Sequence, residues 1–319
     1  MPGRKTDVKD SEWIADLLKD GLLKGSYIPS REQRELKELV RYRRSMIDER
    51  ARELNRLQKV LEGANIKLGS VVSDINGVSA RQMLMSMIQG NEDVDRLVLF
   101  AKRKMKEKTD DLKRSLKGLM GRQQRMILSR MMEHINYLDG LIESLDEEIK
   151  ERMRPFEDKV VALDAITGVG ERSAQTIIAE IVTDMSTFPS ARHLASWAGM
   201  CPGNNESAGK KKSGKTRKGN NTLRCTLVEC AKAAGRSKNT YFSEQYKRLA
   251  ARRGRNRAAV AVGHSILTIA YYILKDNKPF YDLGADYFEK KKKQDIARRA
   301  LKRLEALGYN VTIEEQVSA

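Results

Sequence analysis

Two stretches of the chain carry apolar residues at alternating steps of four and three, the spacing of the buried face of a long helix. The first stretch begins near Arg31, and the second is expected to end at Pro155, because proline cannot continue a helix. Arg43 and Arg50 fall within the first stripe and make its seam imperfect. The apolar members are Leu36, Val40, Ile47, Leu54, Leu57 and Leu61 in the first stripe, and Met131, Ile135, Leu138, Ile142, Leu145 and Ile149 in the second.

Two such helices with a shorter helical region between them predict an antiparallel coiled-coil arm. The pattern fits a dimerisation arm and the core of a helical bundle equally well. Residues 159–275 hold most of the glycine-punctuated turns, and a charged helix follows over 289–303. The expected fold is therefore mainly α, with a long helical arm followed by a compact helical domain. The predicted divisions are residues 1–30, 31–157, 158–288 and 289–319.

The start of the chain also predicts a helix. Trp13, Ile14, Leu17 and Leu18 recur at helical spacing, and Gly21 marks its end. No strand-rich stretch precedes this helix, so a first domain is expected to be missing.

The charge balance points to a polyanionic partner. The chain has 61 lysines and arginines against 43 aspartates and glutamates, a net charge of +18 and a pI near 9.7. Such a surplus is typical of nucleic-acid binding, because each neutralised phosphate releases condensed counterions. A membrane partner is disfavoured, since no run approaches the roughly 18 apolar residues of a spanning helix.

The cysteines indicate neither a disulfide framework nor a zinc site. Cys201, Cys225 and Cys230 form no CxxC pair, and the three histidines have no zinc-ligand spacing. We therefore expect buried, inert thiols in a cytoplasmic protein.

A glycine turn lies between two apolar segments of residues 163–181. Gly168 and Gly170 would let the backbone turn tightly and approach a phosphate, and the helix that follows offers free N–H groups to an anion. This pattern is typical of a helix-hairpin-helix motif, and its alternative is a helical corner without nucleic-acid contact. A dinucleotide-binding loop is disfavoured, because a third glycine and a preceding strand are absent.

A second motif is a basic segment from Trp197 to Arg224, rich in glycine, serine and asparagine. Flexible backbone with dense cations suits a groove that follows a phosphodiester backbone. Ser207 lies just before the cations, which could stabilise its alkoxide and the phosphorane of a transesterification. The alternatives are a solvated loop and a serine that only shapes a turn. The cations are Lys210, Lys211, Lys212, Lys215, Arg217, Lys218 and Arg224.

A third motif places arginines before a strongly apolar helix within residues 251–274. These arginines are expected to contact phosphates. His264 on the apolar face is predicted to be a histidine of the core rather than a general base. The arginines are Arg252, Arg253, Arg255 and Arg257.

Asp7 and Asp10 form the fourth candidate site. Carboxylates three residues apart share one face of a helix and can reach one divalent ion, although aspartate is also common at helix starts.

Together these motifs resemble the IS110 family of insertion-sequence transposases, also called DEDD transposases, and especially its IS1111-like members. The segment KTDVKDSEWIA resembles the end of the family's RuvC-like, RNase H-fold domain. The segments ITGVG, HLASWAGMCPGNNESAGKKKSGKTRKGN and AVAVGHSILTIAYYIL resemble its C-terminal transposase domain.

The resemblance implies four acidic residues that bind Mg²⁺, and a serine that attacks the DNA backbone in a site shared between subunits. Asp7 and Asp10 match the last two acids, and Ser207 matches the nucleophile, with Ser213 as the rival assignment. DNA, an element-encoded RNA that bridges target and donor, and other copies of the chain are the implied partners.

The first two acids of the family pattern should precede Asp7 by a long stretch, so we expect an N-terminally truncated copy. The apolar residues of the first helix should then lack burial partners. Two functions follow: a transposase, or a nucleic-acid-binding remnant without catalytic activity.

Overall fold

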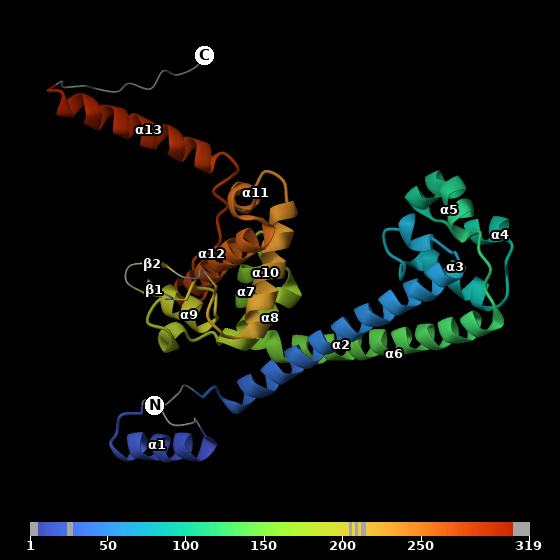
Figure 1. Cartoon of the computed structure of the whole chain (residues 1–319), viewed down its shortest axis with the longest axis horizontal. Helices are drawn as coiled ribbons and strands as arrows, with labels where there is room; N and C mark the ends of the chain where they lie inside the picture. Colours follow the sequence, from blue (N-terminus) through green and yellow to red (C-terminus); the bar gives the residue numbers. More distant parts are fainter. Residues whose placement is uncertain (1–5, 24–27, 204–205, 208–209, 212–214, 309–319) are drawn as a thin grey trace. The chain divides into compact units, whose positions relative to one another are not determined.

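The computed structural model describes residues 6–23, 28–203, 206–207, 210–211 and 215–308, and almost all of its regular structure is helical (Figure 1). The predicted mainly α class is confirmed. The chain forms two compact units, one of residues 36–180 and one of residues 1–35 with 181–319. Residues 158–180, which the sequence pattern grouped with the domain that follows, share a unit with the long helices.

An antiparallel pair of long helices runs through the unit of residues 36–180. The helices are α2 (Arg31–Gly63) and α6 (Arg122–Met153), and Figure 1 shows them side by side. Ion pairs join residue 43 to 146 and 50 to 139, and the His134 ring lies 3.9 Å from the Glu53 carboxylate, so the α6 number falls as the α2 number rises. The pair is therefore antiparallel, and its supercoiling stays a prediction.

The predicted apolar stripes face the interior of this pair. In α6 the stripe from Ile135 to Ile149 is buried, while Met131 is half-buried beside a buried Met132. In α2 the ends of the stripe are buried, whereas Ile47 and Leu54 are half-buried. The helix α6 ends at Met153, directly before the short helix η3 (Arg154–Phe156) that contains Pro155, as expected.

Short helices cap the far end of the pair, in a segment of residues 64–121 that we call the arm tip. Its core joins Leu61 of α2 and Leu128 of α6 to apolar residues of the tip such as Met83 and Leu112. The elements of the arm tip are η1 (Leu68–Ser70), α3 (Val78–Ile88), α4 (Val94–Val98), η2 (Arg103–Lys108) and α5 (Thr109–Leu116).

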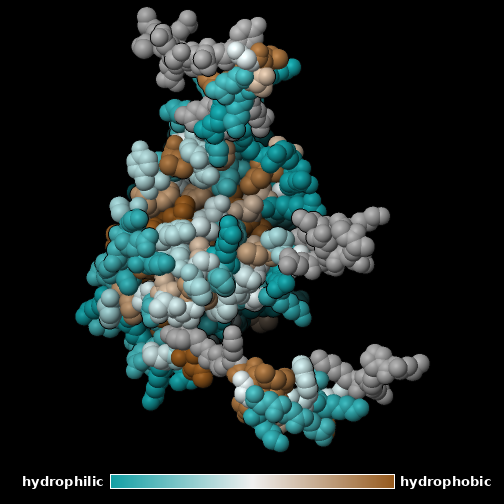
Figure 2. Space-filling view, turned by 90° about the vertical axis from the view of Figure 1, so that its left-hand side faces the viewer, coloured by the Kyte–Doolittle hydropathy of each residue, from teal (hydrophilic) through white to brown (hydrophobic). Residues whose placement is uncertain are grey.

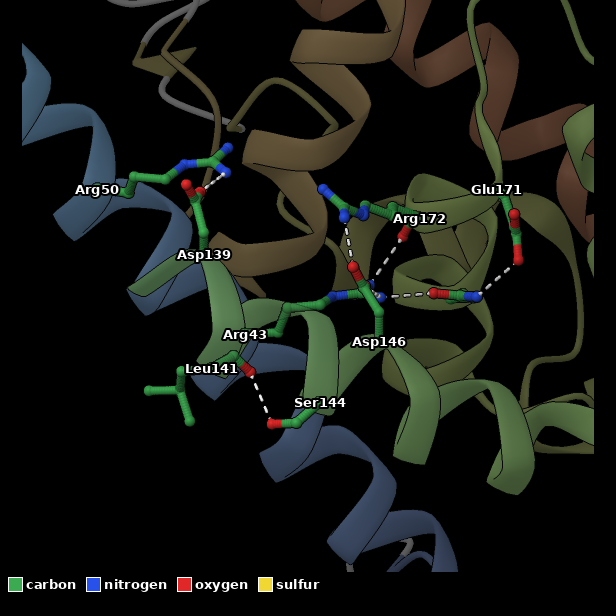
Figure 3. A network of polar contacts seen from close by, with 9 residues as sticks. Arg43, Arg50, Asp139, Leu141, Ser144, Asp146, Glu171 and Arg172 are labelled. Carbon is green, nitrogen blue, oxygen red and sulfur yellow. Dashed lines mark hydrogen bonds and ion pairs between the residues drawn. The ribbon is translucent and has the colours of Figure 1, made fainter. Parts of the chain in front are cut away.

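Arg43 lies in the seam of the pair and is only 3% exposed. Its Nη1 donates to Asp146 Oδ1 at 2.8 Å and to Gln175 Oε1 at 2.7 Å, and Asp146 also pairs with Arg172 (Figure 3). Burial lowers the pKa of the Arg43 guanidinium, and the hydrogen bond to Asp146 opposes that effect. Because Gln175 and Arg172 belong to α8 (Glu171–Ile181), one buried cation joins three helices.

A buried carboxylate secures the other end of α8 to α2. Both carboxylate oxygens of Glu180 accept from Arg41, at 2.6 and 3.0 Å, and Lys37 Nζ lies 3.1 Å from Oε2. The Glu180 side chain is fully buried, so these contacts offset its desolvation. The helix α7 (Glu157–Asp164) precedes α8, and a turn connects them.

The second unit is built around α12 (Arg255–Asp276), which packs against α9 (Ala191–Trp197), α10 (Asn221–Arg236) and α11 (Tyr241–Arg253). Close packing against α10 relies on Gly263, since a Cβ there would lie 3.1 Å from the Leu227 carbonyl oxygen. The short helix η4 (Met185–Thr187) also contacts α12.

Among the described residues α12 is long and apolar enough to cross a membrane, by length and composition alone. This corrects the sequence-based statement that no segment approaches that length. The most apolar part of α12 is 56% buried, and the core helix of a globular domain passes the same test. His264 of α12 is half-buried, and burial lowers its pKa, which fits the predicted core histidine.

The terminal helices differ in their anchoring. Aromatic contacts tie the start of α13 (Tyr287–Ala306) to α11, with the rings of Phe288 and Tyr241 stacked at 5.0 Å. In contrast, α1 (Asp7–Lys19) has no buried residue. Trp13 is 63% exposed, and Figure 2 shows brown, apolar side chains on this helix at the bottom of the view. The expected lack of burial partners for its apolar residues is confirmed.

A small hairpin separates α9 from α10. Strands β1 (Glu206–Ser207) and β2 (Lys210–Lys211) are antiparallel, and an isolated bridge joins Pro202 to Thr216 below them. At the base of the hairpin, a Cβ on Gly219 would lie 2.3 Å from the Gly199 nitrogen. Gly199 itself has φ +69°, a left-handed conformation that favours glycine. Two glycines therefore let the chain close on itself before α10 begins.

Gly219→Ala should destabilise the protein by about 2 kcal/mol, because the added methyl group meets rigid backbone rather than a mobile side chain. Chemical denaturation monitored by circular dichroism measures this loss. Gly170→Ala is the control, since a Cβ there meets nothing within 4 Å, and its free energy of unfolding should be nearly unchanged. Equal stability of the two variants would contradict the close approach.

Asp146→Ala should cost about 3 kcal/mol, because it leaves the buried Arg43 charge without its carboxylate. Glu133→Ala on the same helix removes the partner of an exposed cation, Arg130, and should cost about 0.5 kcal/mol or less. Chemical denaturation of both variants at the same salt concentration measures the two free energies of unfolding. A similar cost for both would show that burial of Arg43 carries no special penalty.

Candidate nucleic-acid interface and nucleophile

The hairpin brings the candidate serine into register with the basic segment. Ser207 is the Cα partner of Lys210, and Glu206 is the partner of Lys211. Lys212 and the rival serine, Ser213, lie outside the described residues. The expected flexible loop is therefore, where the structure describes it, a paired hairpin.

Backbone hydrogen bonds hold the lower part of the hairpin. The Gly203 N–H donates to the Lys215 carbonyl at 2.9 Å, and the Arg217 N–H donates to the Cys201 carbonyl at 3.4 Å. Lys215, Arg217 and Lys218 are exposed on the returning chain. The predicted cations here consequently stand on a segment whose backbone is fixed.

The returning chain leads directly into a capped helix. Asn220 is the N-cap of α10, and its side chain accepts from the Leu223 N–H at 3.1 Å. Arg224 lies in the first turns of α10 and is half-buried, unlike the exposed cations before it. Among the predicted phosphate-contacting cations of this segment whose side chains the structure describes, Arg224 is the least exposed.

The predicted arginine cluster lies at the corner between α11 and α12. Gly254 has φ +83° and stands between the helices, so the chain reverses direction without a longer loop. All four arginines are exposed, and none forms a salt bridge within the described part of the chain. Their charge is therefore available to an anion. The four are Arg252, Arg253, Arg255 and Arg257.

The glycine turn has helix–turn–helix geometry, but its two glycines are not equivalent. Gly168 adopts φ +87°, whereas Gly170 has ordinary backbone geometry and space for a Cβ. The first turn of α8 is engaged internally, since Glu171 accepts from Gln175 and the Arg172 carbonyl accepts from Arg43. The acidic Glu171 also disfavours an anion at this helix start. Phosphate contact at this turn stays a prediction.

Asp7 and Asp10 both lie in the first turn of α1, after the N-cap Thr6. Asp7 is exposed and Asp10 is half-exposed. Within the described residues, no group of three or more histidine, cysteine, aspartate or glutamate side chains could hold a metal ion. Mg²⁺ keeps several waters and is usually bound through one or two carboxylates together with substrate phosphates, so Asp7 and Asp10 could supply only part of its oxygen shell.

The cysteines differ from the prediction of three buried thiols. Cys230 is buried, Cys201 is half-buried, and Cys225 is exposed. The buried face of α10 carries Leu223, Leu227 and Cys230, and helical spacing places residue 225 on another face.

Sequence reasoning missed two features that position the site. The Glu180 carboxylate, held by Lys37 and Arg41, gave no local signal because its partners are about 140 residues away. The closure of Gly199 on Gly219 did have a signal, since one glycine lies near each end of the basic segment.

Two family models match the chain. Residues 161–247 match the transposase IS116/IS110/IS902 family, and residues 1–66 match a transposase model of the DEDD type from the IS110 group. The first match includes the hairpin and the glycine turn, and the second includes Asp7 and Asp10. The DEDD match suggests dependence on a divalent metal. The arginine cluster lies just beyond the first match.

Curated relatives agree with these matches. The chain is 26% identical over 154 residues to a pilin gene-inverting protein of Moraxella lacunata, covering 46% of this chain and 48% of the relative. It is 27% identical to the pilin gene-inverting protein of Moraxella bovis, with the same coverage. A probable family 20 transposase of Pseudomonas aeruginosa is 26% identical over 152 residues, covering 46% of this chain and 44% of the relative.

The matched segments thus span about half the length of these relatives. Both family models describe transposases, and together they contain the two aspartates, the glycine turn and the serine-bearing hairpin. These matches support an IS110-family transposase.

Proposed function

We propose that the chain binds the DNA of an insertion element through the hairpin and the arginine cluster, and that Ser207 is the nucleophile in strand cleavage and transfer. The observation that carries this proposal is the register of Ser207 opposite Lys210, in a hairpin with a closed base. A nucleophile requires a fixed position relative to the reacting phosphate. A hairpin held at Gly199 and Gly219 provides such a position, whereas an unpaired loop does not.

The chemistry is a transesterification at phosphorus. The Ser207 oxygen loses its proton and bonds to phosphorus, one P–O bond of the DNA backbone breaks, and the departing sugar oxygen gains a proton. The intermediate carries extra negative charge on its equatorial oxygens. Cations of the hairpin, with Lys210 closest in register, would stabilise that charge.

Further partners follow from the family resemblance. We propose an element-encoded RNA and other copies of the chain as partners in the cytoplasm, and Mg²⁺ as the metal. Asp7 and Asp10 would supply two carboxylates toward that ion, which would stabilise charge on the DNA phosphate. These two carboxylates would form only part of the ion's oxygen shell.

A protein that binds nucleic acid without cutting it is the second candidate. Within the described residues, no group of three or more metal-ligating side chains includes Asp7 or Asp10, which favours this alternative. The two functions share the basic surfaces and differ only in chemistry at Ser207. Binding and covalent attachment must therefore be measured separately.

Binding by the hairpin should be strongly salt-dependent. The affinity for duplex DNA should fall with a log–log slope of about 0.9 per contacted phosphate. Replacing Lys210, Lys211 and Lys212 together with alanine should lower that slope by up to about 2.7. Fluorescence anisotropy across a salt series measures both slopes.

The matched control removes three cations that each pair with a glutamate on α6. This paired-charge control is Arg130→Ala, Arg152→Ala and Arg154→Ala, whose partners are Glu133, Glu148 and Glu151. It lowers the net charge equally and should leave the slope nearly unchanged. Equal slopes for the hairpin variant and the wild type would place the phosphate contacts elsewhere.

A trapping substrate tests the nucleophile. DNA with a sulfur in the bridging position of the scissile phosphate releases a thiol that religates poorly, so a covalent protein–DNA adduct should accumulate. Mass spectrometry should map the adduct to Ser207. Ser207→Ala should abolish the adduct and leave binding intact, because removing one hydroxyl does not alter the charge of the hairpin.

Ser196→Ala, which alters an exposed serine of α9, is the control and should form the adduct normally. Attachment at Ser213 would overturn the assignment of the nucleophile. A wild-type chain that binds the trapping substrate with Mg²⁺ but forms no adduct would support the binding-only alternative.

A further inference from the structure

The arm tip and the start of α6 carry a dense positive charge that neither family match includes. Between Lys102 and Arg125 there are ten lysines and arginines and only three aspartates and glutamates. This segment lies between the matched residues 1–66 and 161–247. It contains η2, α5 and the first residues of α6.

Seven of these ten cations are exposed and form no salt bridge within the described part of the chain. The other three are neutralised: Lys113 pairs with Asp95, Arg114 with Asp111, and Arg125 with Glu92. We call the seven the tip cations. They are Lys102, Arg103, Lys104, Lys106, Lys108, Lys117 and Arg122.

The tip cations stand on a rigid base. Leu112 and Leu116 of α5 are buried in the core of the tip, and Met105 of η2 packs against that core. The Lys67 N–H donates to the Ser115 carbonyl at 2.8 Å, and the Leu119 N–H donates to the Ala64 carbonyl at 3.0 Å. The two hydrogen bonds fix the C-terminal end of α5 and the turn after it, and Met105 fixes η2, which carries four of the tip cations.

Elsewhere in the same unit many exposed cations are paired, although Arg52, Lys59, Lys67 and Lys150 form no salt bridge within the described part of the chain. Arg130 and Arg152 of α6 and Arg154 of η3 each have a glutamate of α6 three or four residues away. Such spacing balances charge on a solvated helix. In η2 the ratio is four cations to one glutamate, which self-repulsion makes unfavourable unless a polyanion neutralises it.

From this contrast we infer that the arm tip is a second nucleic-acid-binding surface, which contacts the phosphodiester backbone of a double helix. The arm tip would act apart from the hairpin and the arginine cluster. The inference rests on the proposed function, because the tip would bind the same class of partner. A six-residue 3-10 helix is about 12 Å long. About seven phosphate charges occupy that length of a duplex, enough to face the four cations of η2.

Duplex DNA and helical RNA offer the same phosphate chemistry to such a surface. The arms of the experiment distinguish them, with a DNA duplex and an RNA duplex of equal length and base sequence as probes. Lysines and arginines that contact only phosphates make no contacts to base edges, so binding should depend weakly on the base sequence. The two probes differ mainly in helix geometry, which decides how many tip cations reach phosphates together.

The test uses the full chain with Lys104→Ala, Lys106→Ala and Lys108→Ala, compared with the paired-charge control. On the duplex that the tip binds, the salt slope should fall by about 0.9 for each lost phosphate contact. The paired-charge control should change the slope by less than a third of that effect. These side chains are exposed, and unchanged circular dichroism and thermal unfolding would confirm that the variant is folded.

Site-resolved lysine acetylation then separates this inference from the proposed function. Bound duplex should protect the tip lysines as well as the hairpin lysines, with Lys247, paired with Glu244, as an internal reference. Protection of the hairpin alone, with an unchanged slope in the tip variant, would overturn the inference and leave the proposed function intact. Protection of the tip lysines alone would support the inference and contradict the proposed binding by the hairpin. An acidic protein partner for the tip would leave the tip lysines unprotected by either duplex, and this also overturns the inference.

Discussion

The buried charge of Arg43 sets the geometry of the unit formed by residues 36–180. A cation in the seam of two helices must find partners there, because leaving it unpaired costs several kcal/mol. Asp146 and Gln175 supply those partners from α6 and α8. A slip of α2 along α6 would separate Arg43 from Asp146, so this contact specifies the register of the two helices. A seam of leucines alone would allow several registers of similar energy. The same cation also fixes the start of α8.

Two groups of cations in this chain differ in their physical role. Arg41 and Arg43 neutralise carboxylates inside the fold and position α8, with Glu180 as the second anchor. The arginines at the corner of α11 and α12, and the tip cations, have no such partner within the described residues. Cations of the second group are available to a polyanion, as the net charge of +18 requires. Pairing, rather than residue type, therefore separates structural cations from candidate binding cations.

The sequence predicted the parts of the fold that depend on local periodicity. The stripes of α2 and α6 and the stop at Pro155 needed only helical spacing and proline chemistry. Arg43 was visible only as an interruption of a stripe, since its partner Gln175 is more than a hundred residues away. The hairpin was missed because two-residue strands have no period to detect. Cys225 was misjudged because composition does not reveal which face of a helix a residue occupies.

The hairpin changes how the candidate serine should be weighed. Most serines in glycine-rich segments only shape turns, and composition alone cannot raise Ser207 above that background. Backbone closure at Gly199 and Gly219 excludes side chains from the base of the hairpin, which is a costly arrangement for a segment that merely connects two helices. The same closure fixes the direction in which β1 and β2 leave the core. Catalysis at phosphorus loses orders of magnitude in rate when the nucleophile is displaced by about 1 Å. A closed base therefore matters more to a nucleophile than to a phosphate-contacting lysine, whose long side chain tolerates such displacements.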